Sequence, residues 1–113
     1  MSQTGQFAIR TEKTPDTVTI FLEGELDLSK VPELRRTIDL IAADPQRSLV
    51  LNLQKLTYID STGIGVIVSL LKARDALKAP FAVEAVPRKI QRLFDLTGIT
   101  PFLRIQHSTT ING

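Results

Sequence analysis

The stretch S-L-V-L-N-L-Q-K-L-T-Y-I-D-S-T-G-I-G, residues 48–65, does most to decide the fold. Its first six residues form an apolar run with little alternation, which is typical of a central strand buried on both faces of a sheet. The residues after Y-I-D-S-T-G place apolar side chains at positions 64, 67, 68 and 71, the spacing of one helix face. The polar side of this helix is predicted to carry Lys72, Arg74, Asp75 and Lys78. A buried strand that leads into an amphipathic helix predicts parallel pairing through helical crossovers.

The patterns on either side extend this unit into a larger sheet. Further strands are predicted at residues 6–13, 18–24, 81–86 and 102–105. The first two are separated by a Pro-Asp turn, so they are expected to form a hairpin. One more helix is predicted between an N-cap at Ser29 and a stop near Ala43, and another between Pro87 and Gly98. The fold class is therefore α/β, with a mixed sheet that has a parallel core and an N-terminal hairpin.

Length, charge and cysteine content exclude several classes of protein. With 113 residues, the chain is expected to form one domain, residues 1–113. The net charge is +2, and the closest basic group, Arg88, Lys89 and Arg92, is too small for a nucleic-acid footprint, so no direct nucleic-acid contact is expected. The absence of cysteine excludes disulfides, thiolate chemistry and cysteine zinc sites. The N-terminus lacks a signal-peptide profile, and the most apolar run is far shorter than the ~20 residues of a membrane span. A cytoplasmic location without membrane contact is therefore expected.

Two loops rich in polar residues are expected to meet at one end of the sheet. E-G-E-L-D-L leaves the second strand, and I-D-S-T-G is expected to leave the central strand and enter the long helix. Loops at the carboxyl ends of parallel strands lie together, so Glu25 and Asp27 should approach Asp60 and Ser61. Asp60 and Ser61 also suit plain helix capping, which is the alternative explanation for their presence.

The glycines of this stretch, Gly63 and Gly65, need a separate explanation. Glycine within a helix costs roughly 1 kcal/mol relative to alanine, about as much as one good cap supplies. The two glycines therefore either pack against the sheet or leave a bare patch of backbone against which a partner lies.

Ser61 suits phosphorylation better than catalysis. A nucleophilic serine needs a base within hydrogen-bond reach, but the only histidine, His107, lies in a patternless tail, and G-x-S-x-G is absent. Both phosphate-cradle motifs are absent, and nothing fixes Glu25, Asp27 and Asp60 as ligands of a cation, so no cofactor or metal is predicted.

A hydroxyl at a helix N-terminus is accessible to a kinase. A phosphoryl group there adds about −1.5 to −2 charges, which the helix N-terminus partly stabilises, so the fold should survive. The predicted outcome is a binding switch. A small enzyme or nucleotide-binding protein that uses the same loop is the alternative from a different class.

Four segments make the sequence similar to a known family. They are G-E-L-D at 24–27, L-V-L-N-L at 49–53, Y-I-D-S-T-G-I-G-V at 58–66 and R-L-F-D-L-T-G-I at 92–99. In this order and spacing, the chain resembles the bacterial anti-sigma-factor antagonists of the STAS-domain family over nearly its whole length. The resemblance implies a mixed sheet with helices packed largely on one side. It also implies a protein without catalytic activity, whose partner is an anti-sigma factor that is itself a serine kinase.

The resemblance further implies partner switching that regulates transcription. The unphosphorylated protein would bind the kinase and free the sigma factor, phosphorylation would block that binding, and a PP2C-type phosphatase would reset the switch. A monomer is expected. An interaction module of a signalling scaffold, or of a transport or lipid-trafficking complex, is the alternative within the same family.

Position by position, Ser61 matches the phosphoacceptor of the family. The implied partner-binding positions are Glu25, Asp27, Asp60, Ser61, Thr62, Gly63 and Gly65. Asn52 matches a polar position at the end of the central strand. Two features depart from the family: where relatives often add a further helix after the last strand, this sequence has S-T-T-I-N-G, which leaves that helix an open question, and the variable loop after G-E-L-D carries Leu28 and Ser29.

Overall fold

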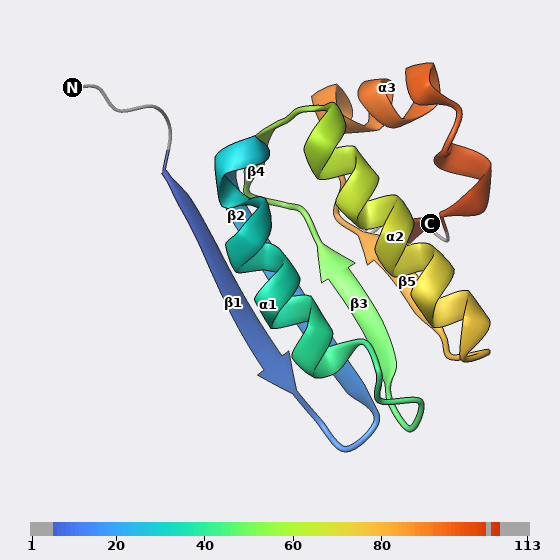
Figure 1. The fold of residues 1–113 in the computed structure, drawn as a ribbon. Helices are drawn as coiled ribbons and strands as arrows, with labels where there is room; N and C mark the ends of the chain where they lie inside the picture. The colour runs from blue at the N-terminus through green and yellow to red at the C-terminus, as the bar shows by residue number, and fades with distance from the viewer. Residues whose placement is uncertain (1–5, 104, 107–113) are drawn as a thin grey trace.

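The sheet consists of an N-terminal hairpin continued by parallel strands (Figure 1). The computed structural model describes residues 6–103 and 105–106. The hairpin strands β1 (Phe7–Lys13) and β2 (Thr17–Leu26) pair antiparallel. Next to β2 lie, in parallel, β3 (Ser48–Asn52), β5 (Phe81–Glu84) and β6 (Ile105–Gln106). The order β1-β2-β3-β5-β6 confirms the predicted mixed sheet with a parallel core.

A further strand, β4 (Leu56–Ile59), pairs in parallel with the far end of β2, where the register of β2 shifts just after Gly24. Gly24 has φ +91°, and a Cβ atom there would collide with the backbone oxygen of Gln6, so only glycine fits this bulge. The sequence pattern does not predict β4, because its two buried residues are separated by two exposed ones instead of alternating. Along its length, β2 therefore changes partner from β3 to β4.

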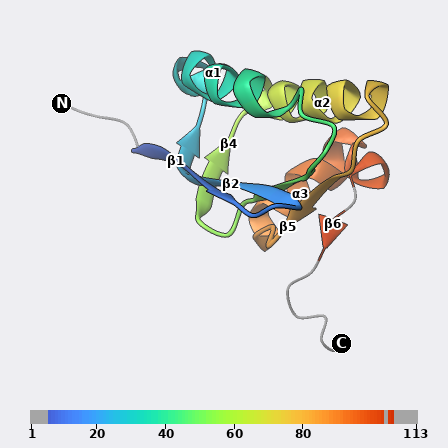
Figure 2. The ribbon, with the colours of Figure 1, turned by 90° about the horizontal axis from the view of Figure 1, so that it is seen from below.

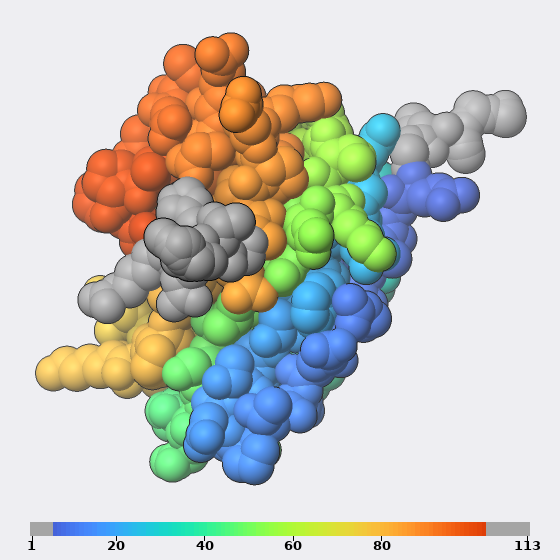
Figure 3. Space-filling model, turned by 180° about the vertical axis from the view of Figure 1, so that it is seen from behind, coloured from blue at the N-terminus to red at the C-terminus, as the bar shows by residue number. Residues whose placement is uncertain are grey.

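Two helices, α1 (Val31–Ile41) and α2 (Ser61–Ala76), lie side by side on one face of the sheet (Figures 1 and 2). The core under them includes Ile20, Leu22, Leu51 and Val83 of the sheet and Leu34, Ile38, Ile67 and Leu70 of the helices. Figure 3 shows the opposite side, where the hairpin, in blue, lies at the surface without a helix over it. The predicted placement of helices largely on one side is confirmed.

The third helix, α3 (Arg88–Thr97), packs against β4 and against the short 3₁₀ helix η2 (Thr100–Phe102). It ends at Gly98, which has φ +80°, as the sequence predicts. The predicted strand at residues 102–105 is wrong in its first part. Phe102 belongs to η2, which begins with a threonine and a proline that favour a tight turn, and β6 begins only at residue 105.

The start of α1 also differs from the prediction. Ser29 is not the N-cap of α1 but lies inside a preceding 3₁₀ helix, η1 (Leu28–Lys30). Asp27 caps η1, because its carboxylate accepts a hydrogen bond from the backbone N–H of Ser29. The prediction of a patternless tail from residue 107 onward falls outside the described residues. Within the described part of the chain, no helix has both the length and the apolar content needed to cross a bilayer.

The prediction that Arg74 lies on the polar side of α2 is wrong, because this side chain is buried. Its guanidinium donates hydrogen bonds to the backbone oxygens of Ala42 (2.9 Å), Asp44 (2.8 Å), Arg47 (2.6 Å) and Pro80 (3.0 Å). Burial lowers the pKa of Arg74, and the nearby Asp44 carboxylate acts in the opposite direction. The four carbonyls belong to the α1–β3 and α2–β5 connections, so this side chain joins them at the end of the sheet where β3 and β5 begin.

Candidate functional site

The two polar loops meet where β2 and β4 end. In the β2–β4 pairing, Glu25 lies opposite Tyr58 and Leu26 opposite Ile59. The backbone N–H of Asp60 then donates to the oxygen of Leu26 at 3.3 Å. The predicted approach of the E-G-E-L-D loop to the D-S-T-G loop is confirmed, and β4, which the sequence pattern does not reveal, brings it about.

The carboxylate of Asp60 joins the two loops. Its Oδ1 accepts a hydrogen bond from the backbone N–H of Gly63 at 2.9 Å, so Asp60 is the N-cap of α2, as predicted. Its Oδ2 accepts a second bond, at 3.2 Å, from the backbone N–H of Leu28 in η1. One side chain therefore sets the start of α2 relative to the turn that follows β2.

Replacing Asp60 should separate these two roles. Asp60→Asn keeps a carbonyl oxygen for the cap but puts an amide where Leu28 needs an acceptor, and we expect a loss of about 0.5–1.5 kcal/mol in the free energy of unfolding. Asp60→Ala loses both bonds and should cost about 1–3 kcal/mol. Urea unfolding of both variants measures the difference. Stability of Asp60→Asn equal to that of the original protein would show that the bond to Leu28 contributes nothing, and equal stability of the two variants would show the same for the cap.

The acidic loop is held mainly by its own contacts. Asp27 Oδ1 accepts bonds from the Ser29 hydroxyl (2.6 Å) and backbone N–H (3.0 Å), and Oδ2 lies 3.4 Å from Lys30 Nζ. The hydrogen bond from the Ser29 hydroxyl, helped by Lys30, lowers the pKa of Asp27, so this carboxylate is ionised at neutral pH. Lys30 Nζ also donates to the backbone oxygen of Glu25 at 3.2 Å. These contacts hold the turn in place beside α2.

Ser61 is the first residue of α2, and its side chain is exposed. Within the described chain, its hydroxyl has no hydrogen-bond partner. It stands at the positive end of the helix dipole, where an added phosphoryl group would be stabilised. Thr62, the next residue, is half-buried, so Ser61 is the more accessible of the two hydroxyls.

The two glycines have different surroundings. Gly63 is buried, and a Cβ atom there would lie 2.8 Å from Ile59 Cγ1 and 2.9 Å from Leu26 Cγ. Gly65 is exposed, and a Cβ atom there would meet nothing within 4 Å. Packing against the sheet therefore accounts for Gly63, which is not part of a bare surface patch, whereas no packing accounts for Gly65.

Alanine should act in opposite directions at these glycines. Gly63→Ala overpacks the junction of β2, β4 and α2, and after the gain in helix propensity we expect a net loss of about 1–2 kcal/mol in unfolding free energy. Gly65→Ala should raise it by up to about 1 kcal/mol, because only helix propensity changes. Urea unfolding tests both variants, and a stabilising Gly63→Ala would contradict the packing explanation.

Asn52, the polar position at the end of the central strand, does not join this site. Its side-chain amide donates to Glu84 Oε2 at 2.7 Å, and its oxygen accepts from the backbone N–H of Gln54 at 3.0 Å. Asn52 lies opposite Phe21 and Glu84 in the sheet register, on the face turned away from the helix-covered core. Its contacts stabilise the end of β3.

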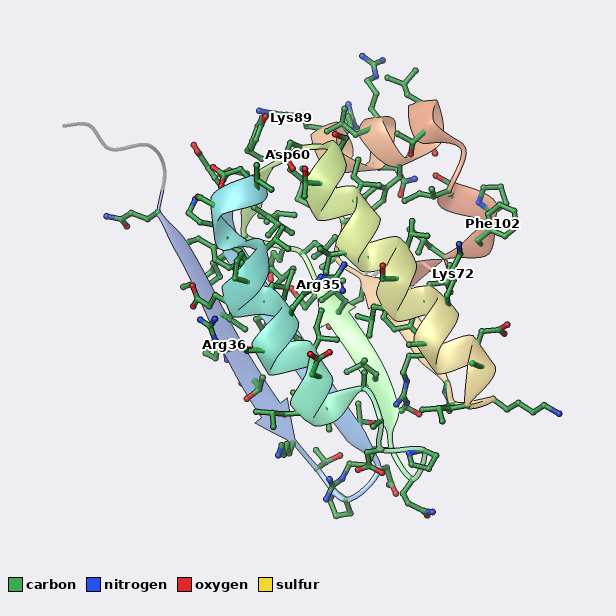
Figure 4. The ribbon with its side chains drawn as sticks, in the orientation of Figure 1. Arg35, Arg36, Asp60, Lys72, Lys89 and Phe102 are labelled. Carbon is green, nitrogen blue, oxygen red and sulfur yellow. The ribbon has the colours of Figure 1, made fainter. Side chains whose placement is uncertain are left out.

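The same end of the molecule carries two side chains that sequence reasoning did not assign to the site. Figure 4 shows Lys89, from the start of α3, at the same end as Asp60. Leu28 is 66% exposed, and its backbone bond to Asp60 places it beside the start of α2. The sequence signal for Leu28 is its position directly after G-E-L-D.

The arrangement does not support a cation held by the three acidic residues of the two loops. The Asp27 carboxylate is engaged by Ser29 and Lys30, and that of Asp60 by two backbone N–H groups. Among residues 6–103 and 105–106, no group of three histidine, cysteine or acidic side chains is placed to hold a metal ion.

Comparison with known proteins identifies the family. The family profile described as the STAS domain matches residues 8–110. This chain belongs to the STAS-domain family. Within it, the site described above lies where the G-E-L-D and D-S-T-G segments of the STAS domain meet.

Curated relatives of this STAS domain are anti-sigma-factor antagonists. An anti-sigma-B factor antagonist of Staphylococcus aureus is 34% identical over 88 residues, which cover 78% of this chain and 82% of that protein. One of Staphylococcus epidermidis is 31% identical over 103 residues, 91% of this chain and 95% of that protein. These relatives place the STAS domain among the anti-sigma-factor antagonists.

Solved structures agree on the fold. The anti-sigma factor antagonist SpoIIAA of Bacillus, in its unphosphorylated form, is 24% identical and has a TM-score of 0.76, with 90% of this chain and 89% of that chain covered. SpoIIAA in its phosphorylated form has a TM-score of 0.72 and 24% identity, with 90% and 92% covered. This likeness concerns the fold of the STAS domain.

Proposed function

We propose that this STAS domain is a phospho-regulated antagonist of an anti-sigma factor that is itself a serine kinase. The unphosphorylated form binds the kinase and releases the sigma factor. Phosphorylation of Ser61 blocks binding, and a PP2C-type phosphatase restores the binding form. The protein acts as a cytoplasmic monomer and is a substrate of the kinase, without catalytic activity of its own.

The exposure of Ser61 carries this proposal. A hydroxyl that stabilises the fold would be bonded or buried, whereas this one is exposed and has no partner in the described chain. The names of the curated relatives support an anti-sigma-factor antagonist, and the unphosphorylated and phosphorylated forms of SpoIIAA support a phosphorylation switch on an intact domain.

The partner surface is proposed to extend from Ser61 to Gly65, one turn further along α2. These two residues are four apart and so share a face of the helix, and both are exposed. A helical glycine that no packing requires fits a partner whose backbone approaches closely. This surface would be bordered by Glu25 near the end of β2, by the turn that begins at Asp27 and is fixed against Asp60, and by the half-buried Thr62.

Phosphate can switch this surface without refolding the domain. Contact with the kinase removes water from the surface around Ser61, and a polar group left unpaired in such a contact costs several kcal/mol. Each 1.4 kcal/mol changes the affinity tenfold, so one phosphoryl group suffices to release the partner.

A phosphosite map tests the proposal. The purified protein is incubated with ATP and soluble extract of its host, and the added phosphoryl group is located by peptide mass spectrometry, with Ser61→Ala as the control. We expect phosphate on Ser61 and none in the control. An extract that phosphorylates other proteins but leaves Ser61 unmodified would refute the switch and favour a constitutive docking module of a scaffold.

A further inference from the structure

Leu28 stands out among the exposed apolar residues. The large apolar side chains exposed in the described chain are Leu28, Leu40, Tyr58, Leu77, Leu96 and Phe102. Single exposed apolar residues are common, so exposure alone identifies no site. Leu28 differs because its backbone N–H binds Asp60 Oδ2, and the same carboxylate caps the helix that begins with Ser61.

The turn that carries Leu28 is held by several hydrogen bonds. Asp27 caps it by accepting bonds from the backbone and hydroxyl of Ser29, and Lys30 Nζ ties its end to the backbone oxygen of Glu25. The Leu28 side chain, 66% exposed, adds little to the core. A rigidly presented apolar group loses little conformational freedom when a partner buries it, which favours affinity.

We infer that Leu28 is the apolar anchor that the partner buries beside Ser61, and that the partner offers a neutral, apolar pocket for it. The inference rests on the proposed function and names the surface that its partner, the anti-sigma factor kinase, must present. Binding energy in interfaces is concentrated in such central, dehydrated contacts.

The apolar side chain of Leu28 itself requires an apolar pocket. The carboxylates on either side, Asp27 and Asp60, already accept hydrogen bonds within the turn and the helix start, and Lys30 Nζ lies 3.4 Å from Asp27 Oδ2, so the pocket for Leu28 need not supply donors to them. An uncharged pocket also explains why phosphorylation should weaken binding instead of strengthening it. Burial of Leu28 expels water next to Ser61, and a phosphoryl group at Ser61 would then meet no compensating charge from the partner's pocket.

Binding measurements on Leu28 variants test the inference. The probe is the host serine kinase, purified by its ability to phosphorylate Ser61, and affinity is measured by isothermal titration calorimetry with unphosphorylated protein. Leu28→Ala should weaken binding about tenfold or more, and Leu28→Met should stay within about threefold of the original affinity. The matched control, Leu40→Ala, removes a leucine that is 86% exposed near the far end of α1 and should change nothing.

A kinetic readout separates anchoring from a disturbed fold. Leu28→Ala should raise the KM for phosphorylation of Ser61 at unchanged kcat, with an unchanged urea midpoint of unfolding. Unchanged affinity for Leu28→Ala, while phosphorylation of Ser61 still abolishes binding, would overturn the inference and leave the proposed function standing. Failure of any host kinase to modify Ser61 would overturn both.

Discussion

Ser61→Glu is expected to weaken binding to the anti-sigma factor kinase by about tenfold to a hundredfold, whereas Ser61→Ala should bind as tightly as the unmodified protein. The glutamate brings a negative charge into a contact that excludes water, while alanine leaves the surface neutral. Full phosphorylation should weaken binding further, because a phosphoryl group carries more charge than one carboxylate. Calorimetry or surface plasmon resonance with the purified kinase measures all three forms.

Ser69→Glu is the matched control for charge. Ser69 is exposed on the same helix, two turns beyond Ser61, so it adds the same charge to α2 away from the helix start. We expect a small effect on binding from Ser69→Glu, and an unchanged fold from Ser61→Glu because an acidic residue in the first turn favours the helix dipole. Equal affinity of Ser61→Glu and the unmodified protein would count decisively against the switch.

Arg74→Met is expected to lower the free energy of unfolding by about 3–5 kcal/mol. Methionine fills much of the volume but leaves four backbone oxygens, in the two connections that Arg74 joins, without their charged donor. Urea unfolding followed by circular dichroism measures the loss. Lys72→Met removes an exposed cation from the same helix and should stay within about 0.5 kcal/mol.

Arg74→Met also separates stability from recognition. The residue acts at the end of the sheet where β3 and β5 begin, away from Ser61, so the molecules that remain folded should bind the kinase with unchanged affinity. Stability within 1 kcal/mol of that of Lys72→Met would show that water replaces the guanidinium at little cost.

Most of the sheet could be predicted from sequence because apolar residues alternate along β2 and form an unbroken run in β3. The predicted burial of β3 on both faces is only partly met, because Ser48 and Val50 are half-buried. The convergence of the two loops also followed from strand direction, since parallel strands end at one edge. The sequence did not reveal β4, whose four residues are too few and too irregular to show a period. The strand β4, which positions Asp60 at the site, is therefore evident only from the three-dimensional structure.

The errors at single residues have a common physical cause. The helical spacing predicts that Arg74 faces solvent. Its hydrogen-bond acceptors are backbone oxygens of distant loops, and every residue type has such an oxygen, so the sequence cannot indicate them. Gly63 and Gly65 are the same residue type and lie two residues apart in α2. They differ only in their surroundings, because Leu26 and Ile59 pack against Gly63 and no described residue packs against Gly65. Tertiary contacts decide what each of these residues does.

The change of pairing partner along β2 divides one strand between two tasks. Residues 17–21 pair with β3 beneath the helices, and from Gly24 onward the strand pairs with β4 and leads into the turn that carries Leu28. Leu26 within the second portion still belongs to the buried core, whereas none of residues 27–30 is buried. We therefore expect that residues 27–30 can be exchanged without repacking the core, so that a STAS domain can change the surface of this turn on a constant frame.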